Sequence, residues 1–229
     1  MQLSKANVEV LTANIEYIAT LPIAARTLAH MLHAGQRRAG GEPFITHPEM
    51  VVRNFSRWLG GASRPGMASR SPECVCVATQ ALTVCWLHDV LEDCPITACT
   101  LRARLLDEWL LLRRPSDTPL SAWQTYTSRC LVDVVEELSG EFSGKCVSTL
   151  AVLVKSFDIE ANLATCAALP EARRMRWLSE KIEQLTAMRA ASPERMGELF
   201  ADLELPASYR FTTLIDELLT RAEALRGEA

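Results

Sequence analysis

The chain has 229 residues, of which 48% are hydrophobic and 23% charged, so it has enough apolar side chains for a core and is not a disordered protein. Its formal net charge is −4 at pH 7, which gives no overall positive field to attract nucleic acid. An anionic ligand would therefore need a local basic group or a metal ion. None of the cysteines forms a C-x-x-C pair, so we expect neither a zinc ribbon nor a thioredoxin-type site.

The start of the chain lacks the basic stretch followed by an apolar one that marks a secretory signal. The longest uncharged apolar run ends at Leu87 and is too short to span a membrane. We therefore expect a cytoplasmic protein with reduced thiols and no membrane contact.

Apolar residues recur at helical spacing along nearly the whole chain, and strand-like alternation is scarce. The pattern predicts helices over about residues 8–18, 22–33, 48–59, 74–93, 101–109, 123–138, 147–168, 175–188 and 214–225, with a short one after Pro193. A glycine-punctuated loop separates the second and third of these, and residues 60–72 form a long loop rich in Gly, Ser, Pro and Arg. The fold class expected is all-α.

Titratable side chains close the most apolar of the predicted helices. His88, Asp89, Glu92 and Asp93 follow directly on the run Cys74–Leu87. In a continuous helix, His88 would lie one turn from Glu92, and Asp89 one turn from Asp93. Carboxylates are disfavoured at the C-terminus of a helix, and burying them requires a compensating cation. This stretch alone fits a metal site or a solvated helix end.

Two residues elsewhere add donors of the same kind. His47 begins one predicted helix, and Asp158 interrupts the apolar face of another, where an aspartate without a partner would be costly. Two imidazoles and two carboxylates suit Mn²⁺, Fe²⁺, Co²⁺ or Zn²⁺ better than Ca²⁺. His33 is interpreted as a structural residue. The tail beyond Pro170 contains neither histidine nor cysteine, and we expect no chemistry from it.

Three segments, taken in order, resemble the hydrolase domain of the Rel/Spo alarmone enzymes, which belong to the HD superfamily of metal phosphohydrolases. Gly35-Gln-Arg-Arg-Ala-Gly-Gly-Glu-Pro-Phe-Ile-Thr-His-Pro48 resembles the family's G-Q-x-R-K-x-G-E-P-Y-I-x-H-P segment. His88-Asp-Val-Leu-Glu-Asp93 matches H-D-x-x-E-D, and Lys155–Asn162 is similar to K-L-A-D-R-x-x-N. The resemblance covers roughly residues 10–170 and includes no counterpart of the family's synthetase or regulatory domains.

The resemblance implies a stand-alone small alarmone hydrolase of the stringent response. Residues 1–169 would form an HD-domain helical bundle, and residues 170–229 would form accessory helices packed on it. The activity implied is that of a manganese-dependent guanosine or adenosine 3′,5′-bis(diphosphate) 3′-pyrophosphohydrolase, which releases pyrophosphate from a nucleotide. The oligomeric state stays open.

The family's residue roles transfer by position. The metal ligands implied are His47, His88, Asp89 and Asp158, with Mn²⁺ as the family metal and other divalent transition metals as alternatives. Glu92 and Asp93 would orient or deprotonate the attacking water. The substrate-binding residues implied are Arg38, which would stack on the base, together with Arg37, Asn162 and Lys155.

The chain departs from the family pattern at three positions near the nucleotide. Ala39 replaces a lysine, Phe44 a tyrosine and Ile159 an arginine. None of the three is a predicted ligand, so hydrolysis remains the expectation while the base preference stays open. The alternatives are an adenosine alarmone, another nucleotide such as NADPH, or a catalytically silent protein that binds a nucleotide or a partner.

Overall fold

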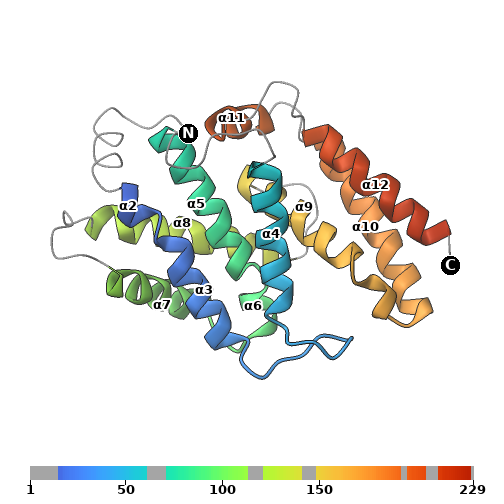
Figure 1. Cartoon of the computed structure of the whole chain (residues 1–229), viewed down its shortest axis with the longest axis horizontal. Coiled ribbons are helices and arrows are strands. Elements are labelled where there is room, and N and C mark those ends of the chain that lie inside the picture. The colour runs from blue at the N-terminus through green and yellow to red at the C-terminus, as the bar shows by residue number, and fades with distance from the viewer. Residues whose placement is uncertain are drawn as a thin grey trace.

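The computed structural model describes residues 15–60, 71–112, 121–140, 148–191, 195–204 and 211–227. Within these ranges all regular elements are helices, and the only β-type pairing is an isolated bridge between Arg37 and Pro43 (Figure 1). The expected all-α fold is confirmed. The helices are α2 (Ile15–Ile18), α3 (Leu21–Leu32), α4 (Thr46–Gly60), α5 (Pro72–Leu87), α6 (Val90–Asp93), α7 (Ala98–Leu111), α8 (Ser121–Ser139), α9 (Thr149–Leu163), η2 (Cys166–Ala168), α10 (Glu171–Ala191), α11 (Arg195–Asp202) and α12 (Phe211–Gly227).

Serine and threonine side chains begin several of these helices. Ser71 caps α5 by accepting a hydrogen bond from the amide of Cys74, and Ser148 caps α9 in the same way. Thr97, the predicted cap of α7, accepts from the amide of Thr100. Each cap satisfies an amide that the helix itself leaves without a partner. The loop 60–72 and the first predicted helix lie largely outside the described residues.

The predicted helix over 74–93 is wrong in one respect, because it is two helices. α5 ends at Leu87 and α6 begins at Val90. Between them, the Asp89 carbonyl oxygen accepts from the amides of both Glu92 and Asp93, at 3.1 and 2.9 Å, which tightens the turn. Asp93 still lies one turn beyond Asp89, because its amide bonds to the Asp89 carbonyl, but the exposure of these residues differs: His88 is buried, whereas Glu92 and Asp93 are exposed.

α9 also ends earlier than predicted, at Leu163, and the short 3-10 helix η2 takes up the remainder of the predicted segment. Asp158 nevertheless lies well inside α9 and is buried there.

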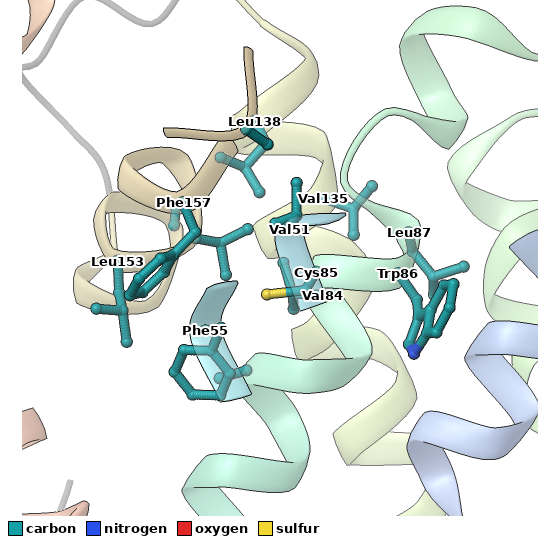
Figure 2. Packing of buried hydrophobic residues seen from close by; sticks show 14 of the residues in the cluster. Val51, Phe55, Val84, Cys85, Trp86, Leu87, Val135, Leu138, Leu153 and Phe157 are labelled. Atoms are coloured by element: carbon teal, nitrogen blue, oxygen red, sulfur yellow. The ribbon is translucent and has the colours of Figure 1, made fainter. Parts of the chain in front are cut away.

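The hydrophobic core is continuous from α2 to α12. At its centre, Figure 2 shows Val51 and Phe55 of α4 facing Cys85 of α5 and Phe157 of α9. Phe55 and Phe157 meet edge to face with ring centroids 5.5 Å apart. This contact locks α4 to α9, and Phe157 directly precedes Asp158 in the chain.

The C-terminal helices belong to the same core. α10 and α12 lie side by side (Figure 1), and both contact α9. Leu178 and Leu185 of α10 and Ile215 of α12 are fully buried. The predicted division at residue 169 falls just before α10.

The segment Pro72–Asp93 is long and apolar enough to cross a membrane, contrary to the expectation that its apolar run is too short. However, 72% of its most apolar window is buried inside the protein. Packing in the helical core therefore accounts for its apolar composition.

Candidate metal centre

Four side chains from distant parts of the chain converge between α4, α5, α6 and α9. His47 is the second residue of α4, His88 and Asp89 form the turn between α5 and α6, and Asp158 lies in α9. Their exposed fractions are small: 2% for His47, 2% for His88 and 4% for Asp158. The sequence-predicted ligand set is thus brought together in the folded chain.

The donor atoms of these side chains face one another. His47 Nε2 is 3.2 Å from Asp89 Oδ2 and 3.0 Å from Asp158 Oδ1. His88 Nε2 is 3.0 Å from Asp89 Oδ2, 3.6 Å from Asp158 Oδ1 and 3.2 Å from His47 Nε2. His47, His88 and Asp89 each offer a donor atom within 4.8 Å of the other two, and Asp158 joins them through both imidazoles.

The spacing suits a divalent transition-metal ion. Two donors that bind one such ion at right angles lie about 3 Å apart when each bond is about 2.1 Å long. The closest pairs, at 3.0 to 3.2 Å, match this separation. Two imidazole nitrogens with two carboxylate oxygens also form a donor set for Mn²⁺, Fe²⁺, Co²⁺ or Zn²⁺.

Neighbouring groups orient the predicted ligands. His88 Nδ1 lies 2.9 Å from the carbonyl oxygen of Cys85, which can only accept, so Nδ1 carries the proton and Nε2 faces the cluster. Asp158 Oδ1 accepts from Asn162 Nδ2 at 2.6 Å, and Oδ2 accepts from Lys155 Nζ at 2.6 Å. A metal-binding imidazole and carboxylate need such support to hold their orientation. His47 Nδ1 has no hydrogen-bond partner among the described residues.

Electrostatics in the polypeptide alone favour charged groups at this centre. Burial opposes the charged form of His88, but the negative charge of Asp89 and hydrogen bonds with Asp158 and Asp89 outweigh it and raise the pKa of His88 to about 10. Burial likewise opposes ionised Asp158, but the Lys155 ammonium and the two histidines hold the pKa of Asp158 well below its usual range. For Asp89 the charge of His88 has the same effect, so its pKa is lowered. Both carboxylates are therefore ionised and available as ligands at neutral pH.

Glu92 and Asp93 lie on α6, one turn beyond the ligand Asp89, and both are exposed. Partial burial and the negative charge of Asp89 raise the pKa of the Glu92 carboxyl, against the opposing charge of Lys155. Partial burial and Asp89 raise the pKa of Asp93 in the same way. A carboxylate with a raised pKa is a better proton acceptor, which fits the role predicted for this pair.

Arg38 and Asn162 are joined to the ligands by a chain of hydrogen bonds. Arg38 donates from Nη2 to Asn162 Oδ1 at 2.7 Å, and Asn162 in turn donates to Asp158. Arg38 Nη1 has no hydrogen-bond partner among the described residues. These two predicted substrate-binding residues therefore lie beside the ligand cluster, with one guanidinium nitrogen of Arg38 still available.

Arg37 is placed differently. Its side chain is exposed and donates to the carbonyl oxygen of Gly41 at 2.6 Å, within its own loop. Gly41 has a φ of 91°, a backbone conformation that favours glycine and lets the loop turn back on itself. No contact with the ligand cluster is found for Arg37 among the described residues, so its predicted substrate role gains no support from this geometry.

Two further groups near the centre were not predicted from the sequence. Gln36 donates to the backbone carbonyl of Asp93, 57 residues away in the sequence. Lys181, on α10, is half-buried, and this burial, together with the nearby positive charge of Lys155, lowers the pKa of Lys181. Gln36 occupies the second position of the G-Q-x-R segment, but that motif does not indicate its contact with Asp93. Lys181 has no local sequence signal, because it lies near Lys155 only through the packing of α10 on α9. The prediction that the tail carries no chemistry stays a prediction.

The chain was compared with protein-family profiles, with curated proteins and with solved structures, and none of the three comparisons finds a match.

Proposed function

We propose that the chain is a metal-dependent phosphohydrolase of the HD type that removes the 3′-pyrophosphate from an alarmone nucleotide. The observation that carries the proposal is the convergence of His47, His88, Asp89 and Asp158, whose donor atoms lie 3.0 to 3.6 Å apart. The three segments that resemble the Rel/Spo hydrolase domain, residues 35–48, 88–93 and 155–162, also supply the four residues of this one cluster. A manganese ion is the first candidate for this donor set.

The residues around the ligands support hydrolysis rather than binding alone. A divalent ion lowers the pKa of a bound water and polarises a phosphoryl oxygen. Glu92, with its raised pKa, would accept the proton that this water releases, and Asp93 would orient the water. The water oxygen would bond to the phosphorus attached to the nucleotide's 3′ oxygen, and the bond between that phosphorus and the 3′ oxygen would break. The 3′ oxygen would take up a proton and become a hydroxyl, and pyrophosphate would leave. A binding module has no need of such a carboxylate pair.

Arg38 and Asn162 would hold the nucleotide next to the ligands. The hydrogen bond between Arg38 and Asn162 orients the guanidinium plane, and a planar cation stacks well on a purine. Lys155 already neutralises Asp158 at 2.6 Å, so we assign it support of that ligand rather than contact with substrate.

The departures from the family pattern bear on the choice of base. Ile159 is fully buried in the core and so does not line the site. Phe44 stacks on His33, and Ala39 is exposed in the loop. Two of the three departures thus lie in the Arg38 loop, where the base is expected. Guanosine and adenosine alarmones are both candidates, and NADPH represents another nucleotide class. A cytoplasmic location stays a prediction.

A substrate panel tests the proposal. The purified protein is incubated with Mn²⁺ and, separately, with ppGpp, pppGpp, ppApp, pppApp and NADPH, and the products are resolved by chromatography. We expect pyrophosphate from at least one alarmone and none with Asp89→Ala, whereas Asp133→Ala, which removes an exposed carboxylate paired with Arg102, retains activity. Phosphate release from NADPH alone would favour the second candidate, and turnover of no compound would contradict hydrolysis of these nucleotides.

A further inference from the structure

The side-chain amide of Gln36 bridges two segments that are distant in the chain. Its Nε2 donates to the backbone carbonyl of Asp93 at 2.8 Å, and its Oε1 lies 2.7 Å from His33 Nδ1. Gln36 belongs to the loop that carries Arg38, whereas Asp93 ends α6. The amide therefore connects the loop expected to hold the base with the helix that carries the carboxylate pair.

The chemistry of these partners fixes both the amide orientation and the histidine tautomer. A backbone carbonyl only accepts, so the Gln36 nitrogen faces Asp93 and the Gln36 oxygen faces His33. His33 Nδ1 must then carry the proton and donate it to Gln36. His33 is 3% exposed, and its ring is held in place by stacking on Phe44 at a centroid distance of 4.5 Å.

The same group of residues continues to a predicted metal ligand. The amide of Phe44 donates to the Gln36 backbone carbonyl at 2.9 Å, and the Phe44 ring meets His47 edge-on at 6.3 Å. Cys94 completes the group: its sulfur lies 3.5 Å from His33 Nδ1 and 3.7 Å from Gln36 Nε2. We call His33, Gln36, Phe44 and Cys94 the strap.

α6 needs such an external tether. A single helical turn is unstable by itself, because nucleation fixes several residues for very few hydrogen bonds. Val90, at the start of α6, is buried in the core, and α6 contacts α8. Glu92 and Asp93 at its other end are exposed, and the nearest core contact there is that of Cys94, the next residue, which is 7% exposed. Gln36 binds the chain at this exposed end.

We propose that Gln36, oriented by His33, is a positioning residue that fixes the Glu92–Asp93 carboxylate pair relative to the metal ligands. His33 is thereby more than the structural histidine expected from the sequence. The catalytic consequence rests on the proposed function, whereas the tethering of α6 does not. A misplacement of about 1 Å in a reacting group costs about 10²-fold in rate, which sets the size of the effect expected.

Hydrogen–deuterium exchange tests the tether without any assumption about activity. In full-length Gln36→Leu, the amides of Glu92, Asp93 and Cys94 should exchange about tenfold faster than in the unaltered protein. Gln80→Leu, which removes a glutamine whose side chain donates to Cys76 Sγ one turn earlier in α5, is the matched control and should leave these amides unchanged. Should Gln36→Leu fail to fold, Gln36→Glu keeps the acceptor for His33 but loses the donor to Asp93, and it should show the same faster exchange. Unchanged exchange in a folded Gln36 variant would overturn the proposal.

Kinetics with the substrate found in the panel then test positioning. Gln36→Leu should lower kcat by about 10- to 100-fold, with KM and the thermal stabilisation by Mn²⁺ nearly unchanged, because the Gln36 side chain bonds to His33, Asp93 and Cys94, none of which is a predicted metal ligand. His33→Asn, which retains a donor near Nδ1, should be less impaired than His33→Leu. In a background that removes both carboxylates, Glu92→Gln with Asp93→Asn, the effect of Gln36→Leu on kcat should disappear. If Gln36→Leu lowered kcat by the same factor in that background as in the unaltered protein, the positioning role would be overturned. If amide exchange is faster in Gln36→Leu but the unaltered protein turns over no substrate, the tethering of α6 is supported and only the proposed function is rejected.

Discussion

Lys155 Nζ lies 2.6 Å from Asp158 Oδ2, while Oδ1 of the same carboxylate faces both His47 and His88. One aspartate thus balances a buried ammonium on one side and the predicted metal position on the other. Since Lys155 and Asp158 are 13% and 5% exposed at their side chains, solvent screens this pair only weakly.

Removal of Lys155 should therefore make the stability of the folded protein depend more strongly on bound metal. Lys155→Met leaves Asp158 buried without its ammonium partner, and breaking such a pair costs about 3–5 kcal/mol. We expect a loss of this order in urea unfolding with a chelator present and a smaller loss with Mn²⁺, because the ion replaces the missing positive charge. Lys155→Arg is the matched control. Equal losses of unfolding free energy with and without Mn²⁺ would contradict the role of Lys155 in balancing the charge of Asp158 at the metal centre.

Glu92→Gln tests the assignment of the proton acceptor. The amide keeps the shape of the side chain but cannot accept a proton, so turnover should fall by about 10²- to 10⁴-fold while Mn²⁺ is retained. Steady-state kinetics and metal content measured on the same preparation check both halves. Full turnover in this variant would remove Glu92 from the mechanism.

Arg38→Ala should raise KM more than it lowers kcat, because the guanidinium is expected to bind the base rather than the reacting phosphate. The substitution also removes the donor to Asn162 Oδ1, so Asn162 loses one of its two orienting contacts. Arg37→Ala, measured in the same assay, is the comparison. Arg38 is linked to the predicted ligands through Asn162, whereas Arg37 bonds within its own loop. An unchanged KM for Arg38→Ala would argue against base stacking.

The stability of the metal-free protein should depend on pH in a defined direction. The folded-state pKa of His88, about 10, lies above its unfolded value of 6.5, so its stabilising contribution is complete below pH 6.5 and is lost as pH rises towards 10. Asp158 has a lowered pKa, and its contribution is lost only in acid, below its ordinary value of 3.8. Urea unfolding with a chelator should show decreasing stability from pH 6.5 to about pH 9. A constant or rising stability in this window would contradict the charged state assigned to His88.

The sequence predicted the helices well where apolar spacing was regular, as in α3, α4 and α10. It failed at the turn after Leu87, because the run of titratable residues there continues the helical pattern although the Asp89 carbonyl closes a tighter turn. The ligand set was recognisable from short motifs around His47, His88 and Asp158. The strap was not, since Gln36 reaches Asp93 across 57 residues and only the packing of α3 beside α5 and α7 brings the two together.

The most direct test of the central claim is Mn²⁺ binding by the unaltered protein and by Asp89→Ala, measured by titration calorimetry after treatment with a chelator. Asp89 Oδ2 lies within 3.2 Å of both imidazole nitrogens, so its removal takes away one of the two carboxylates that face both histidines and leaves Asp158 as the other. The account predicts one tight site in the unaltered protein and in Asp133→Ala, and at least about a 10²-fold weaker one in Asp89→Ala. Equal Mn²⁺ affinity in all three proteins, or no binding to any, would contradict the metal centre.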